Sequence, residues 1–254
     1  MKTNAILRIL LYGILLLVLV GILLAALAGH SYTVLESDTQ VTSQTMDPAE
    51  IDALTIDWAA GDIRILTGDV EKITFTENGA FDEDESFYVS VSDGCLKIAY
   101  SRPRISLTMG SLPRKDLTVV VPKDWYCRRL TLNAASVDIE AEGLRVGEMV
   151  LSGASMELDF HGEVDTLKSS GASTEVTLRC ENRPEKIDLS GASCEFSLTL
   201  PRGCGFRVHS SGLSSSFRCE EDWIAEDGIY SYGDEHCVIH SSGVACEIEI
   251  QFAK

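Results

Sequence analysis

The residues of this chain that most clearly suggest chemistry are five carboxylates that recur at one position of a repeated motif. Each is the sixth residue of a segment whose commonest form begins SGAS, and the five are Asp138, Glu157, Glu175, Glu195 and Glu247. Carboxylates stacked at one position concentrate negative potential, which favours divalent cations or cationic peptides. A solvated face that keeps a sheet soluble explains the same pattern more simply. We therefore treat these five residues as a candidate ligand-binding set.

The other reactive residue types form no catalytic set. The motif serines have no recurring histidine or lysine beside them, and the chain contains no G-x-S-x-G sequence. His209 and His240 occupy the same motif position, and Asp188 shares it, but a metal site normally needs a third strong ligand. The sequence therefore predicts no catalytic residue, no metal site and no cofactor.

The cysteines also favour a structural interpretation. None of the eight forms a C-x-x-C pair, which argues against a zinc ribbon. Four of them, Cys180, Cys194, Cys219 and Cys246, fall on positions that alternate with polar residues. A free cysteine at such a position behaves as a small hydrophobic residue. We expect these thiols to be buried, reduced and slow to react.

A repeat that fills the second half of the chain must position these residues. Its six copies start at Asn133, Ser152, Ser170, Ser190, Ser211 and Ser242, at spacings of 19, 18, 20, 21 and 31 residues. Periods near 20 residues are typical of solenoids, in which each unit stacks on its neighbours. Apolar and polar residues alternate within each copy, which predicts strands with one buried face. We expect the motif glycines to turn the chain sharply at positive φ.

The repeats predict an all-β fold, a parallel β-solenoid with rungs of about 20 residues. Buried columns should run through Leu158, Val176 and Phe196, between exposed glutamates. Residues 51–132 are less regular and are predicted to form the N-terminal rungs and cap of the same solenoid. Residues 219–236 are predicted to form a loop or hairpin near the C-terminal cap.

An apolar segment precedes the repeats. Residues 9–29 carry no charge and are long enough for a helix that crosses about 30 Å of hydrocarbon. Lys2 and Arg8 precede the segment, so a single-pass protein with a cytoplasmic N-terminus is predicted. A cleaved signal peptide is the alternative, because Ala26 and Ala28 form a small-x-small site. The predicted parts are a cytoplasmic tail (1–8), a transmembrane helix (9–29), a polar stalk (30–50) and an extracytoplasmic β-strand-repeat domain (51–254).

The charge of the chain restricts its partners. Its formal net charge is −18, from 39 acidic and 21 basic residues. Such a surface repels nucleic acid and attracts cations. The predicted partners are therefore the membrane through residues 9–29, together with cationic peptides, divalent cations or another envelope protein, and no nucleic acid.

The SGAS motif with its alternating strands, preceded by LTVVVPKDW at residues 117–125 and an apolar N-terminal span, resembles the putative adhesin family of bacterial envelope proteins. The resemblance covers roughly residues 50–254. It implies a right-handed β-solenoid and an envelope location, and it brings no catalytic residues to this chain.

Three function classes follow. The first is a membrane-anchored extracytoplasmic module for binding, adhesion or envelope sensing, without catalysis. The second is a structural scaffold that assembles end to end, as solenoids with open ends can. The third is a polysaccharide-cleaving β-helix enzyme, which would need acid and base carboxylates clustered with arginine or lysine, and the outward positions supply little of that mixture.

Overall fold

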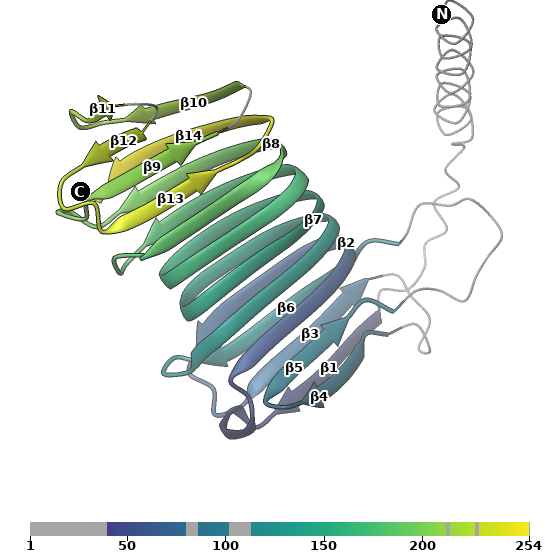
Figure 1. Cartoon of the computed structure of the whole chain (residues 1–254). Helices are drawn as coiled ribbons and strands as arrows, with labels where there is room; N and C mark the ends of the chain where they lie inside the picture. Colours follow the sequence, from purple (N-terminus) through teal and green to yellow (C-terminus); the bar gives the residue numbers. More distant parts are fainter. Residues whose placement is uncertain (1–39, 80–85, 102–112, 212–213, 227–228, 254) are drawn as a thin grey trace, which may run out of the picture. The chain divides into compact units, whose positions relative to one another are not determined.

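The computed structural model describes residues 40–79, 86–101, 113–211, 214–226 and 229–253. They all belong to one compact unit, Asp38–Lys254. These residues form fourteen strands and one short 3-10 helix, η1 (Pro48–Glu50). The strands join in a single sheet that winds into successive rungs (Figure 1).

Three long strands form the body of the molecule: β2 (Ala53–Gly68), β7 (Tyr126–Cys180) and β8 (Lys186–Leu200). β7 pairs in parallel with β2 and with β8, and it winds through several rungs without a break. Val176 lies opposite Phe196, and both are buried together with Leu158. The predicted register between the repeats is therefore confirmed. It follows from the alternation, because a slip of one residue would turn every apolar side chain to solvent.

The N-terminal end of the sheet is mixed. β6 (Lys115–Pro122) and β5 (Cys95–Ala99) pair in parallel with β2, whereas β3 (Ile73–Gly79) runs antiparallel to β6. The edges are β1 (Gln40–Met46), antiparallel to β3, and β4 (Tyr88–Ser92), antiparallel to β5. Part of the segment predicted as a polar stalk is thus paired in the sheet as β1.

At the C-terminal end the last two repeats exchange places. The fifth repeat contains β9 (Phe206–Ser210) and β10 (Ser214–Cys219), and the sixth contains β13 (Cys237–Ser241) and β14 (Ala245–Phe252). β13 pairs in parallel with both β8 and β9, and β14 with both β8 and β10. The sixth repeat therefore lies between the fourth and the fifth.

The chain reaches this arrangement through an antiparallel hairpin. β12 (Ile229–Tyr232) pairs antiparallel with β9 and with β11 (Ile224–Glu226). These two strands extend the sheet beyond the fifth repeat, and the chain then returns toward β8 as β13 (Figure 1).

The predicted fold class, a right-handed parallel β-solenoid preceded by a transmembrane helix, is corrected by these pairings. The fold is all-β, but its sheet is mixed, with antiparallel pairs at both ends. Tight turns impose this arrangement, since a two-residue connection joins only antiparallel strands. Asp93 and Gly94 make such a turn between β4 and β5, with φ angles of 50° and 75°.

The predicted single-pass membrane localisation is corrected as well. Across the part of the chain that the structure describes, no helix is long and apolar enough to cross a bilayer. The segment predicted as the transmembrane helix, 9–29, lies outside the described residues.

The motif glycines are required by close packing and not by positive φ, which corrects a second expectation. Gly153 and Gly191 are not among the residues with positive φ. A Cβ atom on Gly153 would lie 1.8 Å from the carbonyl oxygen of Ala134, and one on Gly191 would lie 2.5 Å from that of Gly171. The rungs therefore approach so closely at this corner that only hydrogen fits.

The cysteines are free thiols and most of them lie in the core. Six are buried: Cys127, Cys180, Cys194, Cys204, Cys237 and Cys246. Burial raises the pKa of the Cys127 and Cys180 thiols to about 12 and that of Cys194 to about 11. Cys219, which was predicted to line the core, is only half-buried, as is Cys95.

We expect the six buried thiols to resist alkylation in the folded protein at pH 8, because burial suppresses the thiolate that reacts. Intact-mass analysis after iodoacetamide treatment should show fast labelling of at most two cysteines, Cys95 and Cys219. All eight should be labelled once guanidinium unfolds the chain. Fast labelling of more than two thiols without denaturant would contradict this burial.

Candidate functional site

The parallel pairing of the rungs brings the five predicted carboxylates into one line. Glu175 lies opposite Glu195, and Glu195 lies opposite Glu247 on β14. Within β7 the motif glycines of successive rungs stack in the same way, with Gly171 against Gly153. This stacking aligns Glu157 with Glu175 and places Asp138 one rung earlier.

The line continues past the repeats at its N-terminal end. Asp62 on β2 lies opposite Asp138, and it was not among the predicted residues. At the other end the position opposite Glu247 is Ser216 on β10. We call the six carboxylates Asp62, Asp138, Glu157, Glu175, Glu195 and Glu247 the acidic column.

A signal for Asp62 is present in the sequence. The segment Trp58–Ile63 reads WAAGDI and pairs without a gap with the segment Ala134–Ile139, which reads AASVDI. The segment around Asp62 lacks the SG pair and stands 76 residues before its partner, so a search at a spacing near 20 residues passes over it.

The centre of the acidic column has no basic partners. Asp138, Glu157, Glu175 and Glu195 are exposed, and within the described ranges no basic side chain forms an ion pair with them. Stacked strands place equivalent residues about 4.8 Å apart. Two carboxylates at that separation repel each other by roughly 0.8 kcal/mol in water before salt screening. A cation on this face would relieve that repulsion.

The two ends of the acidic column are neutralised. At the N-terminal end Arg114 Nη2 lies 2.8 Å from Asp62 Oδ1. At the C-terminal end Arg218 Nη1 lies 3.1 Å from Glu247 Oε1. The free charge is therefore confined to the four central rungs.

A second outward line of side chains runs beside the acidic column, two residues further along each strand. It is mixed in charge: Arg64 lies 3.3 Å from Glu140, and Asp159 forms an ion pair with Arg179. A shallow hollow of about 260 Å³ lies between the two lines and is lined by Asp62, Ile63, Arg64, Asp138, Ile139, Glu140, Glu157 and Asp159. The surface thus offers carboxylates on one side of the hollow and paired charges on the other.

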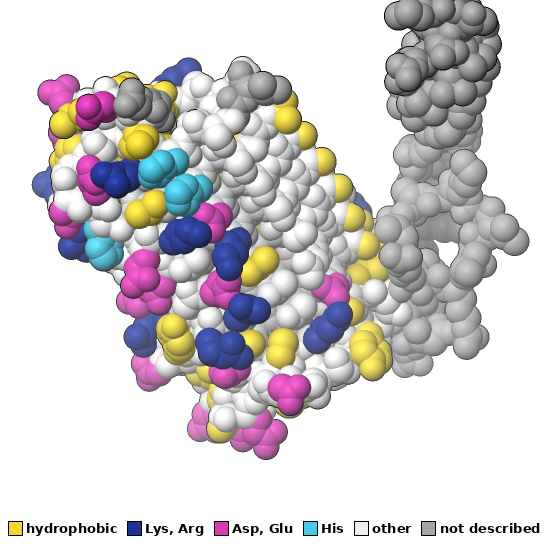
Figure 2. All heavy atoms as spheres, viewed as in Figure 1, with side chains coloured by type: hydrophobic (Ala, Val, Ile, Leu, Met, Phe, Trp, Pro, Cys, Tyr) yellow, Lys and Arg dark blue, Asp and Glu magenta, His cyan; other side chains and the backbone are white. Residues whose placement is uncertain are grey.

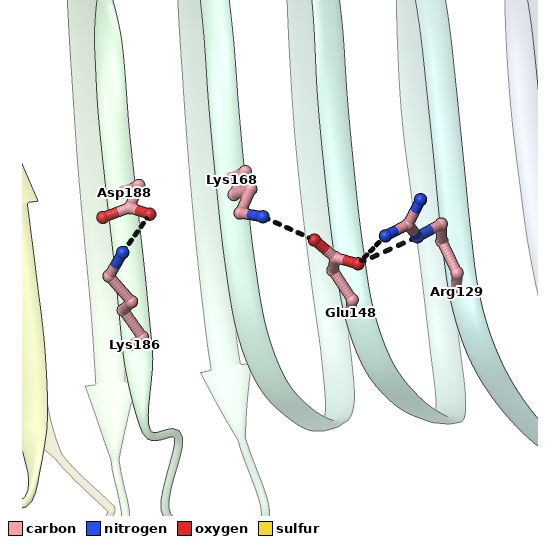
Figure 3. A network of polar contacts seen from close by, with 5 residues as sticks. All are labelled: Arg129, Glu148, Lys168, Lys186 and Asp188. Carbon is pink, nitrogen blue, oxygen red and sulfur yellow. Dashed lines mark hydrogen bonds and ion pairs between the residues drawn. The ribbon is translucent and has the colours of Figure 1, made fainter.

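A different outward surface, on the strand segments that precede the motif corner, has balanced charge. Glu148 Oε2 accepts a hydrogen bond of 2.8 Å from Arg129 Nε, and its Oε1 lies 2.7 Å from Lys168 Nζ (Figure 3). Lys168, and then Arg129, hold the pKa of the Glu148 carboxyl below its usual range. Basic and acidic side chains are interspersed on the face that Figure 2 displays. These contacts tie neighbouring rungs together and leave little net charge for a ligand.

The two histidines of the repeats stack on each other. His209 and His240 lie opposite each other on β9 and β13, with ring centroids 4.9 Å apart, and His240 also lies opposite Asp188. Over the described ranges, no group of three histidine, cysteine or carboxylate side chains is arranged to hold a metal ion. These three residues therefore contribute a packed pair and a neighbouring carboxylate, not a metal centre.

The fold resembles solved structures of bacterial proteins. The structure of a putative cell adhesion protein from Clostridium sporogenes ATCC 15579 superposes with a TM-score of 0.51 and 14% identity, covering 85% of this chain and all of that one. A putative adhesin from Bacteroides fragilis NCTC 9343 gives a TM-score of 0.45 and 10% identity, covering 83% of this chain and 97% of that one. A putative lipid binding protein from Parabacteroides distasonis ATCC 8503 gives 0.42 and 11%, covering 86% and 98%.

Comparison of the sequence itself found less. No family model matches the chain, and no curated protein matches it. At 14% identity the clostridial structure establishes the fold alone. The resemblance to the putative adhesin family is confirmed at that level.

Proposed function

We propose that this protein is a non-catalytic binding module that recognises cationic peptide segments through the acidic column. The observation that carries the proposal is the run of four exposed carboxylates, Asp138, Glu157, Glu175 and Glu195, without a basic partner among the described residues. Solubility alone would accept any polar residue at these positions. Similarity to a structure described as a putative cell adhesion protein supports a binding role without catalysis.

The geometry favours a peptide over a metal ion. Calcium takes six to eight oxygen ligands, whereas a strand face offers one carboxylate per rung at about 4.8 Å spacing. A peptide with several lysine or arginine side chains can reach successive rungs and neutralise each carboxylate in turn. Its binding should be electrostatic and therefore weaken as salt is added. Another protein with an exposed basic segment is the partner that this chemistry fits.

The test compares two variants that lose the same amount of charge. Glu157, Glu175 and Glu195 are changed together to glutamine in one variant, and Glu50, Glu71 and Glu185, which lie elsewhere on the surface, in the other. For an Arg/Lys-rich peptide we expect the first variant to lose at least about tenfold in affinity and the second to lose less than about twofold. Isothermal titration calorimetry at two salt concentrations measures both effects.

Equal losses in the two variants would mean that the peptide responds only to net charge. Affinity that does not change with salt would be equally incompatible with the proposal, because screening must weaken contacts between exposed charges.

A further inference from the structure

The outer edge of β10 is open. β10 pairs in parallel with β14, and no other described strand pairs with it. The N–H of Ser214 and that of Glu220 donate to carbonyl oxygens of Val244 and Ile250 on the β14 side. Backbone groups alternate in direction along a strand, so those of Ser215, Phe217 and Cys219 point to the open edge. Three residues therefore present unpaired N–H and C=O groups to an added strand.

The other half of the same rung is covered, which leaves a step. β9 pairs with β12, and β12 with β11, so the sheet extends two strands further there than at β10. The wall of the step is aromatic: Phe217 stacks on Tyr230 at 4.8 Å and packs edge-on against Trp223 at 5.4 Å. Trp223 and Ile224 remain 37% and 68% exposed. A strand laid along β10 would place its inward side chains against this apolar wall.

The surroundings of the step are acidic. Glu220, Glu221, Asp222 and Glu226 are exposed close to it along the chain. The basic residue of β10, Arg218, is already paired with Glu247 at 3.1 Å. A hollow of about 310 Å³ spans the outward face of β8, β14 and β10, and its lining includes Glu195, Glu247 and Ser216. Outward side chains of an added strand would therefore meet carboxylates.

We infer that the open edge of β10 is a docking site for an extended segment of another protein, in which apolar and basic residues alternate. The segment adds to the sheet as a further strand, with its backbone paired to Ser215, Phe217 and Cys219. Its apolar side chains face Trp223 and Ile224, and its basic side chains face the carboxylates. A second copy of this chain fits the site poorly, because its net charge of −18 opposes association. The site is separate from the central acidic column.

The test uses a peptide of about eight residues that alternates valine and lysine, long enough at ~3.3 Å per residue to span β10. The Ser215→Pro variant loses the outward N–H of this residue, while the hydrogen bonds to β14 are kept. Proline is tolerated on strand edges that face solvent. Ser215→Ala is the matched control, because the buried Ser215 hydroxyl has no hydrogen-bond partner and its loss should cost little.

We expect Ser215→Pro to weaken peptide binding at least about tenfold and Ser215→Ala to stay within about twofold of the parent protein, as measured by calorimetry. Hydrogen exchange at the amides of Phe217 and Cys219 should slow when the peptide binds. A peptide of the same composition with lysines and valines in separate blocks should bind more weakly, because only alternation presents two different faces.

Several outcomes would overturn the inference. Equal binding by the proline and alanine variants excludes strand addition, and the Glu157, Glu175 and Glu195 variant then shows whether the peptide lies on the acidic column instead. If Ser215→Pro unfolds, as judged by circular dichroism, the exchange data decide, and unchanged exchange at Phe217 and Cys219 rejects the site. A dimer of the parent protein that Ser215→Pro dissociates would assign the edge to a second copy.

Discussion

Replacing Lys115 by methionine is expected to lower the free energy of unfolding by about 3–5 kcal/mol at neutral pH, because it leaves a buried carboxylate without its counter-charge. The Lys115 and Glu77 side chains are both fully buried, with Nζ 3.3 Å from Oε1. The backbone N–H of Phe87 donates to the other oxygen of Glu77 at 2.8 Å. Urea unfolding monitored by fluorescence measures the change.

The size of this loss should depend on pH in a defined direction. Burial already raises the pKa of Glu77 above its usual range, and removing Lys115 raises it further. The folded variant then keeps a proton that the unfolded chain releases above about pH 4.3. Stability must therefore fall as pH rises through that value, so the deficit should be small at pH 4 and large at pH 7.

The double variant Lys115→Met with Glu77→Gln separates charge from packing. It removes both buried charges, so most of the loss should be recovered at pH 7. If the single variant loses the same free energy at pH 4 and pH 7, the effect comes from packing around the lysine stem and not from the ion pair.

Gly153→Ala is expected to destabilise the protein by about 3 kcal/mol. The added Cβ would lie 1.8 Å from the Ala134 carbonyl oxygen and 2.9 Å from Met156 Sδ, so the backbone of one rung would have to move. The midpoint of chemical unfolding, compared at an unchanged m-value, measures the change.

Gly203→Ala is the control for backbone conformation. Gly203 has a φ of +78°, and a Cβ there would meet no atom within 4 Å. Its replacement should cost only the left-handed strain, about 1–2 kcal/mol. A Gly153→Ala variant that is no less stable than Gly203→Ala would mean that close packing is not what requires glycine at the corner.

The local register could be predicted from the sequence because it depends on alternation alone. Each strand has one apolar face, so Val176 and Phe196 must lie inward and Glu175 and Glu195 outward in any stack of the repeats. The alignment of the five carboxylates follows from that register. Asp62 was missed because its rung precedes the regular repeats, and only pairing between β2 and β7 reveals it.

The order of the rungs could not be predicted in the same way. The fifth and sixth repeats both present an alternating strand that fits beside β8, so alternation does not distinguish them. The choice depends on long-range contacts: the antiparallel pairing of β12 with β9, and the aromatic contacts of Phe217 with Tyr230 and Trp223. These contacts join segments that share no periodic signal. The antiparallel ends of the sheet escaped prediction for the same reason.

The exchanged order of the last two repeats has a consequence for synthesis on the ribosome. β9 and β10 emerge before β13 and β14, yet the place beside β8 belongs to the later pair. The earlier repeats can stack while the chain is still being made, since domains fold from the N-terminus as they emerge. The last stage differs, because β14 ends at Phe252, two residues before the C-terminus. The native order can therefore form only after translation is essentially complete.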